Sequence, residues 1–400
     1  MSVYGRVEMS LRFEDTQQAF KDISDQELLK SKLLFQAMRR PLFVDWGSKL
    51  VLLALKLRIP VNSVLRTTMV SHFCGGETLD EGVQTARDLE KRGIAALLHY
   101  AVEAAGKKIE FERNMSNTIA IMKNYRTSSL SHPYPFVALK LTGLVRKSIL
   151  EKKQANKGLS QVEEKEYQHF QEMFANICKA AYENKACLLV DAEETFIQEE
   201  IDRQVLSMML QYNKTRAVVY TTVQMYRKRS LEILEKLSYE AVRADFFLGI
   251  KMVRGAYLEQ ENKLAQDNGI ESPLWASKQA TDLAYTTALK LYLPQKHVYI
   301  FAGTHNEESA QQICQFLDQN KSCLKDGRIM LGQLLGMSNH ITLQLAQHGY
   351  PVCKYIPFAP IKKLVPFLIR RAQENTSVVG ELGRELLLLK QELQRRKAKI

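Results

Sequence analysis

From residue 93 onward, short apolar runs alternate with longer amphipathic stretches. An apolar run of this length is typical of a buried strand, and a strand followed by a helix is the repeating unit of parallel α/β proteins. Eight such runs are present, at residues 94–98, 136–141, 186–190, 217–222, 246–253, 298–302, 329–331 and 351–356. Between most of them there is room for a helix, for example at 161–184, 194–212, 225–244 and 275–293. Eight strand–helix units predict a distorted (β/α)8 barrel of the TIM type.

A doubly wound open sheet shows the same local alternation, so the number of strands alone does not separate the two folds. Open sheets that bind dinucleotides carry a Gly-x-Gly-x-x-Gly motif after the first strand, and this chain has none there. The closed barrel is therefore the favoured architecture.

The segment that precedes the barrel predicts helices. One helix opens at Asp25, with Asp25 as its cap, and a second spans 43–57 and stops before Pro60. A third covers 78–92 and ends at Gly93, because glycine readily adopts the conformation that ends a helix.

We therefore divide the chain into an N-terminal helical arm, residues 1–92, and a barrel, residues 93–400, whose C-terminal helix lies over the strand ends. Linker-like stretches are expected at 125–135, 152–159 and 258–273.

The 400 residues carry a formal net charge of +12, and 46% of them are hydrophobic, which is ordinary for a globular protein. The basic residues are scattered except in a helical tail that contains Arg384, Lys390, Arg395, Arg396, Lys397 and Lys399. No nucleic-acid-binding module is recognisable, so nucleic acid is not an expected partner. An anionic membrane surface or an acidic ligand remains as the reason for the basic balance.

The cysteines predict neither a disulfide framework nor a zinc site. Six are present, at positions 74, 178, 187, 314, 323 and 353, far apart and without a Cys-x-x-Cys pair. A reducing compartment is the simplest interpretation, and no metal is expected.

Targeting signals are not visible in the sequence. Acidic residues near the N-terminus, such as Glu14 and Asp15, argue against an intact transit peptide. The most apolar stretch, 50–57, is interrupted by Lys56 and is too short to cross a bilayer. We expect a soluble or peripheral protein whose targeting segment, if it is mitochondrial, has been removed.

Polar residues gather at the ends of the predicted strands, where barrels of this type place their active sites. They are Lys140, Asp191, Gln224, Lys251, Arg254, Thr304, His305, Asn306, Gln333 and Tyr355. Any one of them is typical of a cap or a solvated loop. Their repetition at the same end of nearly every strand predicts a polar ligand site, because burying such groups is costly unless something pairs with them.

The helix after the last predicted strand carries Arg370 and Arg371. Adjacent helical residues point about 100° apart, yet both long guanidinium groups can reach one carboxylate above the helix. A solvated charge pair is the alternative for this dipeptide taken alone.

Five segments resemble, in order, the motifs of the proline dehydrogenase family, in the wording of its eukaryotic-type members. They are Val190-Asp191-Ala192-Glu193, Lys251-Met252-Val253-Arg254-Gly255-Ala256-Tyr257, Thr304-His305-Asn306, Gln333-Leu334-Leu335-Gly336-Met337 and Phe367-Leu368-Ile369-Arg370-Arg371-Ala372-Gln373-Glu374-Asn375. The resemblance covers about residues 69–389, and five ordered motifs are far more specific than any one of them.

The resemblance implies a barrel that binds FAD non-covalently and oxidises L-proline to Δ1-pyrroline-5-carboxylate. In the family, a hydride passes from the ring carbon beside the nitrogen to flavin N5, and the electrons then pass to a membrane quinone. In a eukaryote this implies the matrix side of the inner mitochondrial membrane, and in a bacterium a membrane-associated cytoplasmic enzyme.

The family's roles fall on matching residues of this chain. The resemblance implies that the substrate carboxylate is bound by Lys140, Arg370 and Arg371, and that Glu374 holds one of these arginines. The implied walls of the proline pocket are Leu335, Tyr257 and Tyr355. The implied catalytic group comprises Asp191, Lys251, Tyr257 and Tyr355. The implied FAD contacts are Ala192, Gln224, Lys251, Val253, Arg254, Gly255, Ala256, Thr304, His305, Asn306 and Gln333.

Three positions bear on the substrate. Lys251 stands where bacterial members often have Arg, and Phe367 stands where many members have Tyr, so one pocket wall lacks a hydroxyl. Tyr355 is kept, whereas hydroxyproline-preferring relatives have a smaller residue there, and a Tyr hydroxyl would crowd a 4-hydroxyl group. We therefore favour proline, although residues 369–375 resemble the hydroxyproline dehydrogenase branch, which stays as the alternative.

Two other interpretations are open at this stage. A membrane-surface protein without catalysis would use the basic tail around 384–399, which is also a plausible peripheral membrane contact for the enzyme. An aldolase-type barrel would use Lys140 or Lys251 as a Schiff-base amine and would need no flavin.

Overall fold

The computed structural model describes residues 11–40, 46–47, 49–51, 53, 56–57, 62–102, 108–125, 134–377 and 381–398, and it does not describe the side chains of 62, 373–377 and 381–382. The helix expected at 43–57 and the linker expected at 125–135 lie partly outside these residues.

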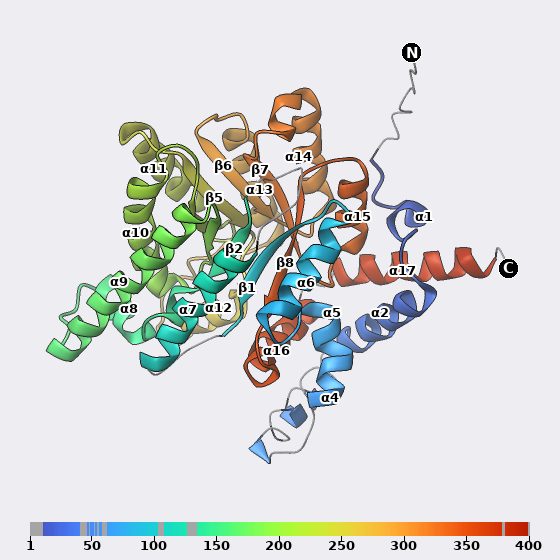
Figure 1. Ribbon diagram of the computed structural model, residues 1–400, viewed down its shortest axis with the longest axis horizontal. Coiled ribbons are helices and arrows are strands. Elements are labelled where there is room, and N and C mark those ends of the chain that lie inside the picture. The colour runs from blue at the N-terminus through green and yellow to red at the C-terminus, as the bar shows by residue number, and fades with distance from the viewer. Residues whose placement is uncertain are drawn as a thin grey trace.

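Eight parallel strands close into a barrel in chain order (Figure 1). They are β1 Ala95–Tyr100, β2 Phe136–Leu139, β3 Cys187–Val190, β4 Val219–Gln224, β5 Leu248–Val253, β6 Val298–Gly303, β7 Ile329–Leu334 and β8 Val352–Phe358. The last strand closes on the first, with Ala95 opposite Cys353 and Tyr100 opposite Phe358. The predicted barrel is confirmed, and each predicted strand is present with ends that shift by at most three residues.

Helices cover the outside of the barrel (Figure 1). They are α7 Lys108–Asn124, α8 Lys147–Gln154, α9 Gln161–Glu183, α10 Thr195–Tyr212, α11 Ser230–Arg243, α12 Leu258–Asp267, α13 Lys278–Tyr292, α14 Glu307–Gln319, α15 Asn339–Gln347 and α16 Ile361–Ser377. Before β1 come α1 Thr16–Ala19, α2 Asp25–Met38, α4 Asn62–Leu65, the π-helical turn Arg66–Val70, α5 Ser71–Phe73 and α6 Leu79–Glu90. Two 3-10 turns, Leu141–Gly143 and Lys321–Leu324, and the last helix α17 Glu381–Lys397 complete the described elements.

Reciprocal side-chain caps fix where two helices begin. At α2 the hydroxyl of Ser24 accepts a hydrogen bond from the Glu27 N–H, and the Glu27 carboxylate accepts one from the Ser24 N–H. Ser160 and Glu163 repeat this pattern at α9. The prediction of Asp25 as the cap of α2 is wrong by one residue, because Ser24 is the cap and Asp25 begins the helix.

The expected linker at 258–273 is wrong, because α12 occupies Leu258–Asp267. This helix is mostly polar, yet its Glu261 is buried and accepts hydrogen bonds from the N–H and the hydroxyl of Thr195, at 2.5 and 2.6 Å. A helix that docks through a carboxylate lacks the apolar stripe from which helices are predicted. The expected linker at 152–159 likewise overlaps the end of α8, which extends to Gln154.

The lower part of the barrel interior is apolar. Side chains that alternate along the strands fill it, and they include Ala95, Leu97, Phe136, Ala138, Cys187, Leu189, Phe301, Met330 and Cys353. Gly332 gives the ring of Phe301 its space, since a Cβ at position 332 would lie 2.2 Å from that ring.

We expect Gly332→Ala to lower the free energy of unfolding by about 1–3 kcal/mol, because the buried Phe301 ring must leave its position to admit the methyl group. Urea unfolding followed by circular dichroism measures the change. Gly158→Ala is the matched control, since a Cβ there meets nothing within 4 Å. Equal effects of the two substitutions would contradict the packing argument.

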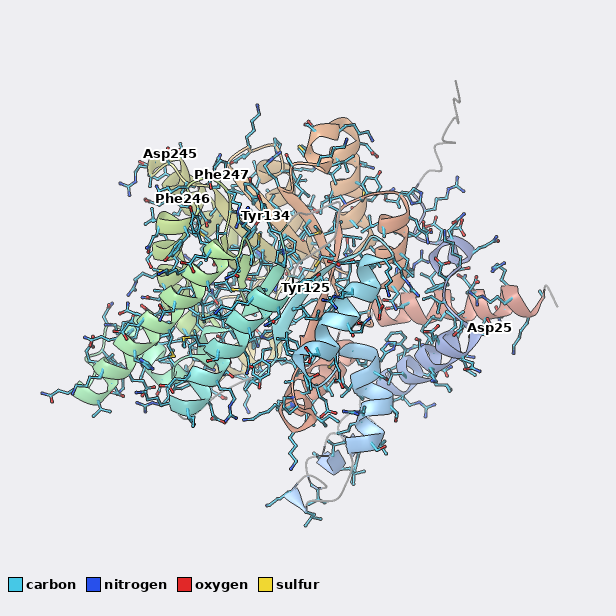
Figure 2. The ribbon with its side chains drawn as sticks, viewed as in Figure 1. Asp25, Tyr125, Tyr134, Asp245, Phe246 and Phe247 are labelled. Carbon is cyan, nitrogen blue, oxygen red and sulfur yellow. The ribbon has the colours of Figure 1, made fainter. Side chains whose placement is uncertain are left out.

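The helices before β1 pack with those that follow β8. Helix α2 runs along α17 (Figure 1), and a second apolar core joins Phe35 of α2, Phe73 of α5, Leu364 of α16 and Leu386 of α17. Figure 2 marks Asp25 at the start of α2, beside α17.

All three arginines of the basic tail make intramolecular ion pairs, and Arg384 pairs with Glu307 at 3.0 Å. Arg396 pairs with Asp25 at 2.6 Å, and Arg395 pairs with Glu392 at 2.7 Å. Part of the positive charge of the tail is therefore balanced within the chain. None of the helices in the described segments has the length and apolar character needed to cross a bilayer.

Candidate active site

Above its apolar layer, the barrel interior becomes polar. His99, Lys140 and Asp191 lie near or just beyond the carboxyl ends of β1, β2 and β3, whereas Lys251 and Tyr355 lie within β5 and β8. Four of them follow, two residues along the chain, the inward-facing Leu97, Ala138, Leu189 and Cys353. Because side chains alternate between the two faces of a strand, this spacing aims the polar groups into the mouth of the barrel.

Four of these groups form one continuous chain of contacts. Lys251 Nζ lies 2.6 Å from Asp191 Oδ1, and the Tyr355 hydroxyl donates to Asp191 Oδ2 at 2.9 Å. His99 Nδ1 lies 2.6 Å from the Tyr355 oxygen. Since the single hydroxyl hydrogen of Tyr355 goes to Asp191, His99 satisfies this contact as the Nδ1–H tautomer.

The protonation states follow from burial and from neighbouring charges. Burial alone raises the pKa of Asp191, but the Lys251 ammonium overcomes this and holds the pKa below its ordinary value. Burial lowers the pKa of His99 to about 3, so its imidazole is neutral. Burial raises the pKa of Tyr355, so the hydroxyl keeps its proton. The chain of contacts therefore joins one ion pair to two neutral donors.

Sequence analysis missed His99. It ends an apolar strand, and a lone histidine in such a run resembles a core residue. The available signal was the alternation itself, because His99 lies two positions after the inward-facing Leu97, as Tyr355 does after Cys353.

Two of the three cations predicted to bind a carboxylate, Lys140 and Arg370, meet at Tyr257. Lys140 Nζ donates to the Tyr257 hydroxyl at 3.2 Å, and the Arg370 guanidinium lies 5.9 Å from the centre of the Tyr257 ring. Arg371 lies 5.4 Å from the Phe367 ring, and its charge acts on Tyr355 and His305. The charges of Lys140 and Arg370 also act on His99, so all three cations border the polar layer of the barrel.

Acidic and hydroxyl neighbours keep Lys140 charged. Burial alone lowers the pKa of Lys140, but Tyr257, Glu193 and Asp191 raise it above the ordinary value. Burial in turn raises the pKa of Tyr257 to about 12. The predicted partner Glu374 belongs to α16, but its side chain lies outside the described residues.

Several predicted cofactor residues line the rim between β3 and β5. Gln224 donates to the Glu193 carbonyl at 2.8 Å, while its buried Oε1 has no hydrogen-bond partner among the described residues. Gly255 has φ +139°, and a Cβ there would lie 2.4 Å from the Tyr226 ring. Ala192 is buried, Val253 is half-buried and Ala256 is exposed.

Predicted residues between β5 and β7 hold one another. Arg254 binds Asp282 at 2.6 Å and the Thr304 hydroxyl at 2.8 Å. Asn306 caps α14, and Gln333 donates to the Thr304 carbonyl at 3.2 Å. The side chains of Asn306 and Gln333 are thus engaged in supporting the rim.

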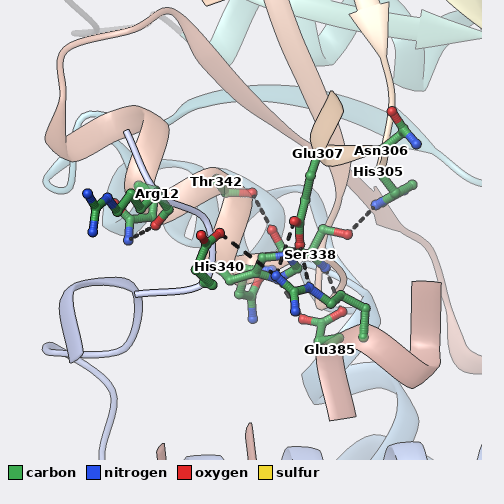
Figure 3. A network of polar contacts seen from close by, with 12 residues as sticks. Arg12, His305, Asn306, Glu307, Ser338, His340, Thr342 and Glu385 are labelled. Atoms are coloured by element: carbon green, nitrogen blue, oxygen red, sulfur yellow. Dashed lines mark hydrogen bonds and ion pairs between the residues drawn. The ribbon is translucent and has the colours of Figure 1, made fainter. Parts of the chain in front are cut away.

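His305 leads to a further polar network (Figure 3). Its Nδ1 lies 2.9 Å from the Ser338 hydroxyl, and burial lowers its pKa to about 3. Leu335 directly follows β7 and is half-buried. Its N–H donates to the Tyr355 carbonyl at 3.0 Å. In the part of the chain that the structure describes, no three His, Cys, Asp or Glu side chains are grouped as a metal site.

Comparison with known proteins decides the family. A sequence profile described as proline dehydrogenase matches residues 82–384, which include all eight strands and every predicted site residue. The chain belongs to the proline dehydrogenase family. The resemblance inferred from the five motifs is thereby confirmed.

Among relatives of this proline dehydrogenase family member, the carbapenem antibiotics biosynthesis protein CarD of Pectobacterium carotovorum is 36% identical over 328 residues, 82% of this chain and 84% of that protein. Proline dehydrogenase 1, mitochondrial, of Dictyostelium discoideum is 29% identical, over 96% of this chain and 74% of its own length. The hydroxyproline dehydrogenase of Xenopus laevis is 30% identical, over 94% of this chain and 88% of its own length.

The same fold occurs in proline utilization A from Bdellovibrio bacteriovorus, with a TM-score of 0.77 at 15% sequence identity. The match covers 96% of this chain and 43% of that longer protein. At this identity the likeness concerns the fold.

Proposed function

We propose that this protein is an FAD-dependent dehydrogenase that oxidises L-proline to Δ1-pyrroline-5-carboxylate. The observation that carries the proposal is that Lys140, Arg370 and Arg371 all border the polar layer of the barrel, where their charges act on His99 and Tyr355. Three cations around a buried site suit a small anion, and the carboxylate of proline is such an anion.

The residues present fit an FAD cofactor. Position 255 leaves no room for a side chain, and Gly255 and Ala256 are exposed, so the backbone there is open to close approach. The unpartnered Oε1 of Gln224 is a buried acceptor that suits a donor on a ligand. We propose that Gln224, Lys251, Arg254, Thr304 and His305 hold the cofactor, together with the backbone of the 253–256 segment. When bound, FAD supplies the acceptor for the hydride that leaves the proline ring.

The chain's own residues orient and activate the substrate. Binding of the carboxylate by Lys140, Arg370 and Arg371 fixes which carbon of the ring faces the cofactor. The amine must be neutral when the hydride leaves, and the surrounding cations favour loss of its proton. Asp191 holds Lys251 and Tyr355 in place, while Tyr257, Tyr355 and Leu335 enclose the ring.

The geometry of Tyr355 favours proline over 4-hydroxyproline. Its hydroxyl is engaged by Asp191 and His99 at 2.9 and 2.6 Å, so it has little freedom to turn away from a larger substrate. Hydroxyproline oxidation on the same site is the second candidate, supported by the relatives that bear that name.

We also propose that the electrons pass to a membrane quinone. This places the protein at the matrix face of the inner mitochondrial membrane in a eukaryote, or at the cytoplasmic membrane in a bacterium. Lys397, an exposed basic residue at the end of α17, suits a peripheral contact with anionic lipid.

Anaerobic titration of the purified protein with L-proline, with 4-hydroxyproline in parallel, tests the function. We expect proline to bleach the visible flavin band at a much lower concentration than hydroxyproline does. Bleaching mainly by hydroxyproline would overturn the substrate, and the absence of a flavin band after FAD is added would overturn the catalytic proposal.

A further inference from the structure

The segment of residues 334–339 runs from the last residue of β7 to the first of α15 and contacts two parts of the proposed machinery. It carries the substrate wall Leu335, whose N–H donates to the Tyr355 carbonyl. Its Ser338 hydroxyl contacts His305, a proposed cofactor residue, at 2.9 Å. A small shift of this segment would therefore move a contact to the substrate and a contact to the cofactor together.

A buried lysine holds this segment from behind. Because Cys353 and Tyr355 face the barrel interior, Lys354 points outward from β8, where it is 2% exposed. Its Nζ donates to the carbonyls of Leu334 and Met337, at 3.1 and 2.5 Å. These two carbonyls flank Leu335 and Gly336.

A carboxylate from the last helix holds the other end of the segment. Glu385 of α17 is 4% exposed, and it accepts hydrogen bonds from the N–H groups of Ser338 and Asn339, at 2.8 and 3.2 Å (Figure 3). Ser338 has φ +49°, a backbone conformation that costs energy in a residue other than glycine. The charged acceptor at the start of α15 stabilises that conformation.

A third contact comes from the N-terminal helices. His72 of α5 lies with Nε2 2.9 Å from the Gly336 carbonyl, so Nε2–H is the donor. Gly336 has φ +78°, and a Cβ there would lie 2.3 Å from the His72 carbonyl oxygen. The segment is thus packed tightly against α5.

The charges of Lys354 and Glu385 take no part in the proposed chemistry. Burial lowers the pKa of Lys354 to about 7, while the charge of Glu385 raises it. A buried ammonium is costly unless it is paired and hydrogen-bonded, so this arrangement is sustained by its hydrogen bonds to the segment and by the nearby charge of Glu385. Glu385 and His72 both lie outside the 82–384 region that the family profile matches.

We propose that Lys354, Glu385 and His72 are positioning residues, which fix residues 334–339 so that Leu335 and His305 are preset for substrate and cofactor. On this view α5 and α17, which flank the barrel, complete the active site by supporting its rim. The inference rests on the proposed function, since it assigns Leu335 and His305 to that reaction.

The test compares two identical substitutions on α17. Glu385→Gln removes the charge that holds the segment, whereas Glu392→Gln removes an equally buried charge that binds Arg395 and Arg396. Displacing a substrate contact by about 1 Å can cost up to roughly a hundredfold. We therefore expect Glu385→Gln to raise the KM for proline and the Kd for FAD, measured by fluorescence titration, by roughly tenfold or more. Glu392→Gln should leave both within about twofold, because Glu392 binds Arg395 and Arg396 rather than the 334–339 segment, and separate sites act independently.

Hydrogen exchange gives a readout that needs no turnover. Amides of residues 334–339 should exchange faster in Glu385→Gln than in Glu392→Gln, because only the first replaces one of the two carboxylate oxygens that accept from Ser338 and Asn339 by an NH2 donor. Lys354→Met should reproduce the change, and Glu385→Gln decides the matter if that variant does not fold. Equal KM, Kd and exchange in the two Gln variants would overturn the inference. A wild-type protein that binds FAD but does not oxidise proline would instead overturn the proposed function, while the exchange comparison would still test the support of the segment.

Discussion

Lys140→Met is expected to lower kcat/KM for proline by about a hundred- to a thousandfold, because it removes a buried cation from the carboxylate site. Truncating one partner of a desolvated charge pair typically costs about 2–5 kcal/mol, or about 30- to 4,000-fold, and the expected loss lies within this range. Methionine keeps most of the volume of the lysine side chain, so the loss reports charge and hydrogen bonding. Steady-state kinetics with an artificial electron acceptor measures it.

The cofactor and a remote lysine provide the controls for Lys140→Met. FAD content should be unchanged, since the proposed cofactor contacts come from other residues. Lys290 of α13 is exposed, and Lys290→Met should leave kcat/KM within about twofold. If Lys140→Met matched Lys290→Met in its kinetics, the carboxylate site would have to lie elsewhere.

Asp191→Ala should lower the free energy of unfolding by about 3–5 kcal/mol, because it leaves the Lys251 ammonium buried without its partner. The two groups are 2.6 Å apart, with side chains 9% and 12% exposed. Tyr355 also loses the acceptor for its hydroxyl. Equilibrium unfolding in urea measures the change.

Two controls separate the electrostatic part of the Asp191→Ala stability loss from the part due to packing. One is an exposed ion pair, and the other is a double substitution. Asp88 pairs with Lys91 at the surface, and Asp88→Ala should cost far less stability than Asp191→Ala, because solvent screens an exposed pair. Replacing both buried partners, as Asp191→Leu with Lys251→Met, should recover much of the stability without restoring turnover. A double variant no more stable than Asp191→Ala would mean that the ion pair is not the source of the loss.

The eight strands were predictable because each is buried on both sides and forms a continuous apolar run. Polar residues such as Asp191 and Lys140 stood out by contrast at the ends of these runs. His99 and Lys354 did not stand out, since each is one polar residue within an apolar strand, and the side on which it lies depends on the register of the closed barrel. Helix α12 was not predicted, because it packs on the barrel through the carboxylate of Glu261.

The support of the rim was beyond prediction for a different reason. Lys354, Glu385 and His72 bind backbone groups of the 334–339 segment, and such contacts leave no pattern of residue types in the sequence. They arise only when α5 and α17 pack beside β7. Five ordered motifs identified the family, whereas these contacts require coordinates.

The pairing of β1 with β8 determines when the polar layer of the site can form during folding. His99 and Tyr355 are 256 positions apart along the chain, and their 2.6 Å contact spans this closure. Loop-closure entropy makes such distant pairings slow, and strands made early in synthesis must wait for the last one. The polar layer therefore forms only when the ring of strands is complete, so that an incompletely folded chain holds Asp191 and Lys251 without the tyrosine and histidine that complete them.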